Sequence, residues 1–327
     1  MQKRRIRTGL FFLMIVLLFV LTGCSSSSSD SQGKAKILMS VSDASDTFRA
    51  SLAKAAKEAA DEKGITLEVM DAKSSVDTQV AQMKQAKEEG YDGIICLPVN
   101  ADTAQQLQAS AGDLPIVFCN SCPDEQNLEK DKYMFVGSDE AVAGTFQADY
   151  VLDFFKNKSE LNVIIIKGES THSATAGRTK AVKEALNASG KKINYVFVDN
   201  ADWSDSLTKE MMEVFFKTGQ PYDCVISNND SMALGAIEAL KEHGDDLSEI
   251  PVLGVDATTD GCASIKTGEM AFTVYQSATG QGKAAIEVIS KLVNGQSAQK
   301  VDGVSKDGLY VWVPFEKVDK SNVSNYN

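Results

Sequence analysis

Polar side chains directly follow two short apolar runs in the second half of the chain. An Asn-Asn-Asp triplet at 228–230 follows the run at 224–227, and Asp256 follows the run at 251–255. Amide and carboxylate groups donate and accept hydrogen bonds, so they can cap a helix or hold a polar ligand. In open α/β sheets, ligands bind outside the carboxyl ends of the strands. We therefore expect Asn229 and Asp256 to face one crevice, with helix capping as the alternative role for each.

The residues around these polar groups predict a strand, a turn and a helix in unbroken order. The run at 224–227 is apolar and contains β-branched residues, and after the triplet apolar residues recur at helical spacing. The helical pattern ends at Gly244, a residue suited to the left-handed position after a helix. The arrangement recurs around Asp256, because the residues at 258–260 are typical of a helix start.

The rest of the chain repeats this alternation of strands and helices. Further strands are expected at 35–41, 65–70, 93–97, 115–118, 134–136, 163–166, 195–198, 271–275 and 309–313. Further helices are expected at 48–63, 76–89, 101–111, 141–156, 174–188, 207–216 and 282–293. Such alternation favours βαβ units with parallel sheets. The rhythm restarts after residue 138, which predicts an α/β protein of two doubly wound, Rossmann-like lobes.

The N-terminus has the layout of an export signal. Four basic residues precede twelve apolar residues at 10–21, which is too short a run to span a bilayer stably. The following Leu-Thr-Gly-Cys resembles the lipobox of bacterial lipoproteins, in which Cys24 is lipidated and becomes the first residue of the mature chain. We therefore expect a signal peptide at 1–23 and a Ser-rich tether at 24–33. The alternative is an ordinary secretory signal with a chance cysteine.

Charge and cysteine content exclude several classes of function. Removal of residues 1–23 takes away four basic residues and no acids, so the net charge moves from −12 to −16. Such an acidic domain argues against nucleic acid and anionic lipid as partners. The spacing of Cys119 and Cys122 could indicate a metal or redox site, but no second such pair or histidine cluster accompanies it. Buried, unreactive thiols are the interpretation we favour.

Three segments carry a resemblance to a known family: VISNNDSMALGAIEAL, PVLGVDATTDG and KGESTHSATAGR. At these segments the chain resembles the periplasmic sugar-binding proteins of the galactose/glucose and ribose type, in the lipoprotein form of an ABC transporter solute-binding protein. The resemblance extends from ILMSVSDASDTF to VWVPFEKVD. It implies two Rossmann-like lobes joined by a hinge of three crossing strands, the periplasmic binding protein type I fold. The implied lobes are 34–138 with 278–311, and 139–277 with 312–327.

The resemblance also implies which residues contact the sugar. These are Asp46, Phe48, Asn120, His172, Arg178, Trp203, Asn229, Asp256 and Gln276. Their chemistry suits a monosaccharide, because planar polar groups can engage neighbouring hydroxyls and aromatic rings can cover the apolar C–H faces. Each residue also has a structural interpretation, such as a core position for Trp203, a solvated charge for Arg178 or a surface loop for His172.

The chain departs from the galactose type at three places. Leu97 stands where that type has an asparagine, and Ala174 stands where it has an aspartate. If both face the ligand, the preferred sugar lacks or reorients the hydroxyls that those polar groups would hold. The acidic calcium-binding loop is also missing, because 157–161 runs directly into a strand. No metal and no cofactor is therefore expected.

These observations predict a lipid-anchored, extracytoplasmic binding protein rather than an enzyme. It would capture a hexose or pentose between its lobes and deliver it to the permease subunits of an ABC importer, as a monomer on the outer face of the bacterial cell membrane. The alternative is a sensor that presents a sugar-like signal to a membrane receptor. An enzyme is disfavoured, because no nucleophile elbow, metal-ligand set or phosphate-binding loop accompanies the acidic residues. A sugar-responsive repressor would need a DNA-binding headpiece where the signal peptide stands.

Overall fold

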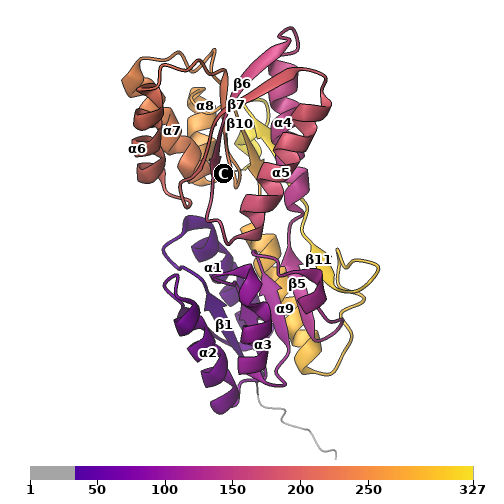
Figure 1. Cartoon of the computed structure of the whole chain (residues 1–327). Coiled ribbons are helices and arrows are strands. Elements are labelled where there is room, and N and C mark those ends of the chain that lie inside the picture. Colours follow the sequence, from indigo (N-terminus) through magenta and orange to yellow (C-terminus); the bar gives the residue numbers. More distant parts are fainter. Residues whose placement is uncertain (1–33, 327) are drawn as a thin grey trace, which may run out of the picture. The chain divides into compact units, whose positions relative to one another are not determined.

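A computed structural model describes residues 34–326 of the chain. The expected signal peptide, Cys24 and the tether lie outside these residues. These residues belong to one compact unit (Figure 1). None of the helices within the described part of the chain combines the length and the apolar character that a membrane crossing requires.

The first lobe is built on a six-stranded parallel sheet. Its strands are β1 (Lys36–Val41), β2 (Thr66–Asp71), β3 (Gly93–Cys96), β4 (Ile116–Cys119), β5 (Tyr133–Gly137) and β11 (Tyr310–Trp312). They lie in the order β11-β5-β4-β3-β1-β2. The strands that lie between others are apolar along their length, as is typical of strands covered on both faces.

Helices cover both faces of this sheet. They are α1 (Thr47–Glu62), α2 (Val76–Glu88), α3 (Ala104–Ala111) and α9 (Ala278–Val293). Because side chains alternate along a strand, Ile37 and Met39 pack in the core beneath α1 and α9, whereas Leu38 packs in the core beneath α2 and α3. The predicted helix at 101–111 is a 3-10 turn over Ala101–Thr103 followed by α3.

The second lobe is also built on a six-stranded sheet, but its edge strand runs in the opposite direction. Its strands are β6 (Glu160–Lys167), β7 (Lys192–Asn200), β8 (Cys224–Ser227), β9 (Val252–Leu253), β10 (Phe272–Tyr275) and β12 (Glu316–Asp319). They lie in the order β12-β10-β9-β8-β6-β7, and only β12 is antiparallel to its neighbour. Sequence analysis did not predict β12, because this edge strand buries a single side chain, Val318, and has no apolar run.

Helices cover both faces of the second sheet as well. They are α4 (Glu140–Phe154), α5 (Ser173–Ala188), α6 (Asp205–Phe216), α7 (Asp230–His243) and α8 (Thr259–Thr267). Figure 1 shows α4 and α5 on one side of the strands and α6, α7 and α8 on the other. Two separate apolar cores fill these faces. The prediction of an α/β protein with two parallel-sheet lobes is confirmed.

The chain passes between the two sheets three times. It leaves the first sheet after β5, returns to it through α9 after β10, and leaves it again after β11 to form β12. Helix α9 packs along α1 of the first lobe, although it directly follows a strand of the second sheet. It begins at Ala278, one turn earlier than predicted, because the Ser277 hydroxyl accepts a hydrogen bond from Gly280 N and caps it.

Candidate functional site

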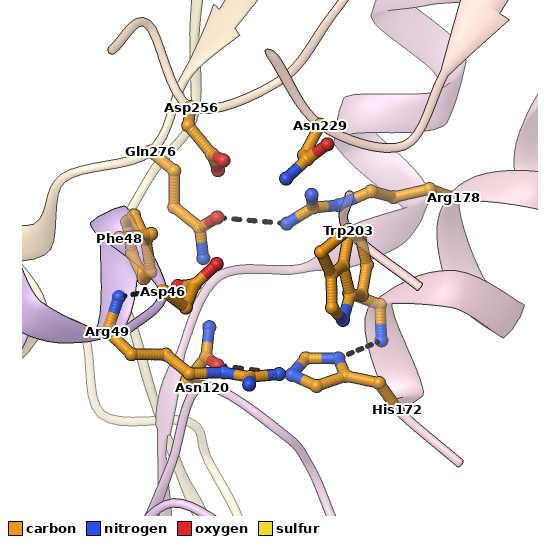
Figure 2. A pocket seen from close by; sticks show the side chains of 11 residues that line it. Asp46, Phe48, Arg49, Asn120, His172, Arg178, Trp203, Asn229, Asp256 and Gln276 are labelled. Atoms are coloured by element: carbon orange, nitrogen blue, oxygen red, sulfur yellow. Dashed lines mark hydrogen bonds between the residues drawn. The ribbon is translucent and has the colours of Figure 1, made fainter. Parts of the chain in front are cut away.

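One pocket collects every residue that the family resemblance selected. Its lining consists of Asp46, Phe48, Arg49, Asn120, His172, Ala174, Arg178, Trp203, Asn229, Asp256 and Gln276 (Figure 2). The first four come from the first lobe and the others from the second lobe or the crossing after β10. The space between these side chains is about 290 Å³, which includes space open to solvent. The part that these residues play in binding stays a prediction.

Three lining residues are also helix caps. One side-chain oxygen of Asp46 accepts a hydrogen bond from Arg49 N at 2.8 Å and caps α1. His172 Nδ1 caps α5, and Asn229 Oδ1 caps α7. Each of these residues has a second polar side-chain atom besides the one used for the cap. Capping and pocket lining are therefore not alternatives for Asn229, because one side chain does both.

Asp256 is not a cap. Thr258 caps α8 through its hydroxyl, which accepts a hydrogen bond from Gly261 N at 3.0 Å. The carboxylate of Asp256 has no hydrogen-bond partner among residues 34–326, and it lines the pocket. Its burial, strengthened by the nearby carboxylate of Asp230, raises the pKa of Asp256 well above its usual range, although the charge of Arg178 opposes the shift. A ligand hydroxyl that donates a hydrogen bond to this carboxylate would stabilise its charged form.

Asp230 does not line the pocket, and its carboxylate holds neighbouring turns together. Its carboxylate accepts hydrogen bonds from Thr258 N at 2.8 Å and from the Thr273 hydroxyl at 2.6 Å. Burial raises its pKa to about 6, against the lowering effect of these hydrogen bonds. The last member of the polar triplet is thus a structural residue that joins the start of α7 to β10 and α8.

Three lining residues adopt left-handed backbone conformations. The φ angles are 65° for Asn120, 66° for Trp203 and 119° for Asp256. Conformations of this kind cost on the order of 1–3 kcal/mol for residues with a side chain and concentrate at functional sites. The three residues follow β4, β7 and β9, so the strained positions lie at the carboxyl ends of strands.

Arg178 connects the polar groups on one side of the pocket. Its Nε donates to Glu140 at 2.6 Å, its Nη1 to the carbonyl of Asn228 at 2.6 Å and its Nη2 to Gln276 Oε1 at 2.9 Å. Glu140 is buried, and the desolvation raises its pKa despite the ion pair with Arg178. The interpretation of Arg178 as a solvated surface charge is wrong, because the side chain is buried in this network.

His172 is buried and neutral. Burial lowers its pKa well below the usual range, and the positive charges of Arg49 and Arg178 lower it further. Its Nδ1 accepts a hydrogen bond from Ala174 N, and its Nε2 lies 3.1 Å from Asn120 Oδ1. The structure therefore replaces the surface-loop interpretation of His172 with a position that links the two lobes.

Two aromatic rings face the pocket. Figure 2 shows Phe48 and Trp203 on opposite sides of the polar groups. The Trp203 ring lies against the backbone of Gly168, where a Cβ atom would come within 2.1 Å of the ring. It also makes an edge contact with His172, with ring centroids 5.3 Å apart. The glycine is thus what permits the ring to occupy this place.

Sequence analysis did not select Arg49, which also lines the pocket. Its guanidinium pairs with Glu169 of the second lobe, with 3.0 Å between Nη2 and Oε2. In the sequence, Arg49 is a single charge in the first turn of a helix, and nothing marks it as buried. Only the contact across 120 positions of the chain identifies it.

The expectation that Leu97 faces the ligand is wrong. Its side chain is buried in the core of the first lobe and does not line the pocket, whereas Ala174 does. Leu97 continues the alternation of β3, which directs it toward the face covered by α1 and α9. Of the two residues that replace polar groups of the galactose type, only Ala174 lines the pocket.

The cysteines and acidic residues do not form a reactive or metal site within the described residues. Cys119 and Cys122 are not joined by a disulfide, and burial raises the pKa of each thiol to about 12. Thiols with such pKa values are unreactive. In residues 34–326, no three His, Cys, Asp or Glu side chains gather in a way that could hold a metal ion.

Comparisons with known proteins identify the family of the chain. A family model described as a periplasmic binding protein domain matches residues 37–297. A candidate rhizopine-binding protein of Rhizobium meliloti is 32% identical over 266 residues, which cover 80% of this chain and 82% of that protein. The D-galactose/methyl-galactoside binding periplasmic protein of Haemophilus influenzae is 30% identical over 283 residues, or 83% of this chain and 85% of that protein.

A solved structure shows the same fold. It is an ABC transporter solute binding protein from Bacillus halodurans with bound myo-inositol, at 28% identity and a TM-score of 0.80, and the match covers 91% of this chain and 99% of that chain. All three relatives are named as binding proteins and not as enzymes. The chain therefore belongs to the periplasmic binding protein family, in the branch that contains sugar-binding transport proteins, and its two lobes have the type I fold of that family.

Proposed function

We propose that the protein captures a monosaccharide or a cyclic polyol of similar size in this pocket and delivers it to an ABC importer. The observation that supports the proposal is the pairing of free polar groups with aromatic walls. Among the described residues, the Asp256 carboxylate and the Gln276 amide nitrogen have no hydrogen-bond partner, and Phe48 and Trp203 flank them. A polyol offers hydroxyls for such groups and C–H faces for the rings.

Closure of the lobes around the ligand completes the proposal. The proposed lobes are 34–138 with 278–311 and 139–277 with 312–327, and the three crossings between the sheets act as the hinge. A ligand that bridges Asp46 of one lobe and Asp256 of the other favours the closed state over an open one. The permease subunits would recognise the closed form.

The binding function is tested by calorimetry on the full chain in detergent. D-galactose, D-glucose, D-ribose, L-arabinose, D-xylose and myo-inositol form the panel, with a matched linear polyol as the control for ring shape. We expect at least one cyclic member to bind and the linear control to bind more weakly. Absence of binding to every member of the panel would argue against the proposed ligand class.

The cellular location is part of the proposal. Cys24 would carry the lipid that anchors the protein to the outer face of the cell membrane, because it directly follows a signal-like apolar run and small residues. Mass spectrometry of the membrane fraction should find an acylated N-terminal cysteine. Export of an unmodified protein that is cleaved at another position would contradict the anchor and leave the binding proposal untouched.

A further inference from the structure

Three carboxamides line the pocket, and hydrogen bonds determine which way each one faces. Met232 N lies 3.0 Å from Asn229 Oδ1, and Arg178 Nη2 lies 2.9 Å from Gln276 Oε1. A backbone N–H and a guanidinium can only donate, so each must meet the oxygen of its carboxamide. The NH2 groups of Asn229 and Gln276 are thereby directed away from these donors. The Gln276 NH2 is buried and has no protein partner in the described chain.

Asn120 is oriented by a relay through His172. Ala174 N can only donate, so His172 Nδ1 must accept its hydrogen bond at 3.1 Å and carry no proton. A neutral ring with a bare Nδ1 carries its proton on Nε2. That Nε2–H therefore donates to Asn120 at 3.1 Å, which makes the contacting atom Oδ1 (dashed line in Figure 2). An imidazolium is disfavoured, because its Nδ1–H would oppose Ala174 N and its charge would lie near Arg49 and Arg178.

The carboxylates of the pocket accept hydrogen bonds, whereas the NH2 groups of the carboxamides donate them. Asp46 accepts a hydrogen bond from Arg49 N with one oxygen, and the carboxylate of Asp256 is unpartnered within residues 34–326. Figure 2 shows Asp256 and Gln276 adjacent on one side of the pocket and Asn120 and His172 on the other. The pocket thus contains both kinds of position: the carboxamide NH2 groups can only donate, and the carboxylates accept.

We propose that His172 is a positioning residue that orients Asn120, so that Asn120, Asn229 and Gln276 all present N–H groups to the ligand. The inference rests on the proposed function and specifies its ligand. Ligand oxygens that face the carboxamides act only as acceptors, so an ether oxygen or a fluorine can take the place of a hydroxyl there. Hydroxyls that face the carboxylate of Asp46, or of Asp256 in its ionised form, must donate, and no such replacement is tolerated there.

The first test needs no ligand. The chain has two histidines, so selective 15N labelling of histidine followed by NMR at pH 7 gives two sets of ring signals, and His172→Asn identifies the set of His172. We expect the neutral tautomer with the proton on Nε2. A proton on Nδ1, or a doubly protonated ring, would overturn the relay. Because this result does not depend on any sugar, it separates failure of this inference from failure of the proposed function.

The second test distinguishes positioning from direct contact. His172→Asn keeps an oxygen that can cap α5 but removes the Nε2–H donor. With the tightest-binding panel member as the probe, either His172→Asn or Asn120→Ala should weaken binding by about tenfold. In the double variant we expect little further loss. Full additivity of the two effects would overturn the positioning role, and thermal unfolding of each variant verifies that it is folded.

The third test uses monodeoxy-fluoro analogues of the same probe. Fluorine accepts weakly and cannot donate, so we expect the analogues to fall into two groups. Those fluorinated at positions facing the carboxamides should bind within a few-fold of the parent, and those at positions facing Asp46 or Asp256 should lose about tenfold or more. Uniform loss or uniform tolerance across all positions would overturn the division of the pocket.

Discussion

Arg49 of the first lobe forms an ion pair with Glu169 of the second lobe beside the pocket. The Nη2 and Oε2 atoms are 3.0 Å apart, and the side chain of Arg49 is only 4% exposed. The two residues of the pair also line a neighbouring pocket, together with Asp46 and Trp203. Because this charge pair exists only when the two lobes meet, we expect it to favour the proposed closed state.

Loss of this pair should make the closed state less stable. In Glu169→Gln, we expect the bound sugar to dissociate about tenfold faster, which corresponds to ~1–2 kcal/mol for a half-buried pair. Stopped-flow measurement of the dissociation rate tests this. Lys57→Ala is the matched control, because the Lys57–Asp61 pair lies within α1 and its side chains are 51% and 66% exposed. Equal rates in Glu169→Gln and the wild type would show that the pair does not contribute to closure.

Asp256 should strengthen sugar binding and lower the stability of the free protein. In Asp256→Asn, an NH2 donor replaces one acceptor oxygen and the negative charge is lost, which should weaken sugar binding by about 1–3 kcal/mol. The folded pKa of Asp256 is raised, so the folded state holds its proton more tightly and wild-type stability falls as the pH rises above about 4. The unfolding free energy of Asp256→Asn should therefore rise relative to that of the wild type as the pH increases from 4 to 7.

Asp230→Asn serves as the contrast for this prediction. Asp230 also has a raised pKa, but its carboxylate accepts hydrogen bonds from Thr258 and Thr273. An amide nitrogen in place of one oxygen would face donors, so this variant should lose stability. If Asp256→Asn also lost stability but bound sugar normally, Asp256 would have a structural role, contrary to the prediction.

The Trp203 ring should depend on Gly168 for its position. In Gly168→Ala, the new Cβ would meet ring atoms of Trp203 at 2.1 Å, so the ring must move. We expect affinity to fall by about 1–2 kcal/mol, approaching the loss in Trp203→Ala. Calorimetry on both variants and on the double variant measures this. A double variant that loses as much as the sum of the two would show that Gly168 acts by another route.

His172 should make the protein sensitive to acid. Its folded pKa is lowered, so below pH about 6.5 the unfolded chain takes up a proton that the folded state does not. The contribution of His172 to the unfolding free energy is complete above that pH and is lost as the pH falls. The unfolding free energy then decreases by at most about 1.4 kcal/mol per pH unit. The slope of unfolding free energy between pH 6.5 and 5 should be smaller in His172→Asn. Buried carboxyls titrate with the opposite sign in both proteins, so the difference isolates His172.

Leu97 should affect stability and not sugar selectivity. In Leu97→Asn, an amide replaces an aliphatic side chain in the first lobe's core, which should cost about 2–5 kcal/mol of unfolding free energy. Denaturant unfolding measures this, and Ala174→Ser at the pocket is the control, with a much smaller expected loss. Altered preference among the panel sugars with unchanged stability in Leu97→Asn would restore the idea that Leu97 faces the ligand.

Local patterns in the sequence were sufficient for the alternation of strands and helices. The apolar run before Asn229, the capping side chain and Gly244 specify one strand and one helix through interactions within a few residues. Because that alternation is local, the two-lobed α/β plan could be predicted. The polar residues after the strands were also visible, and the family resemblance selected nine that line one pocket.

Tertiary structure decided what depends on contacts between distant segments. The ion pair of Arg49 and Glu169, the burial of Leu97 and the edge pairing of β12 each require two parts of the chain to meet. The direction of each pocket carboxamide is decided in the same way, since a carboxamide has no preferred face until a donor fixes its oxygen. The residue types were therefore present in the sequence, whereas their roles as donor, acceptor or core were set by the neighbours that folding brought to them.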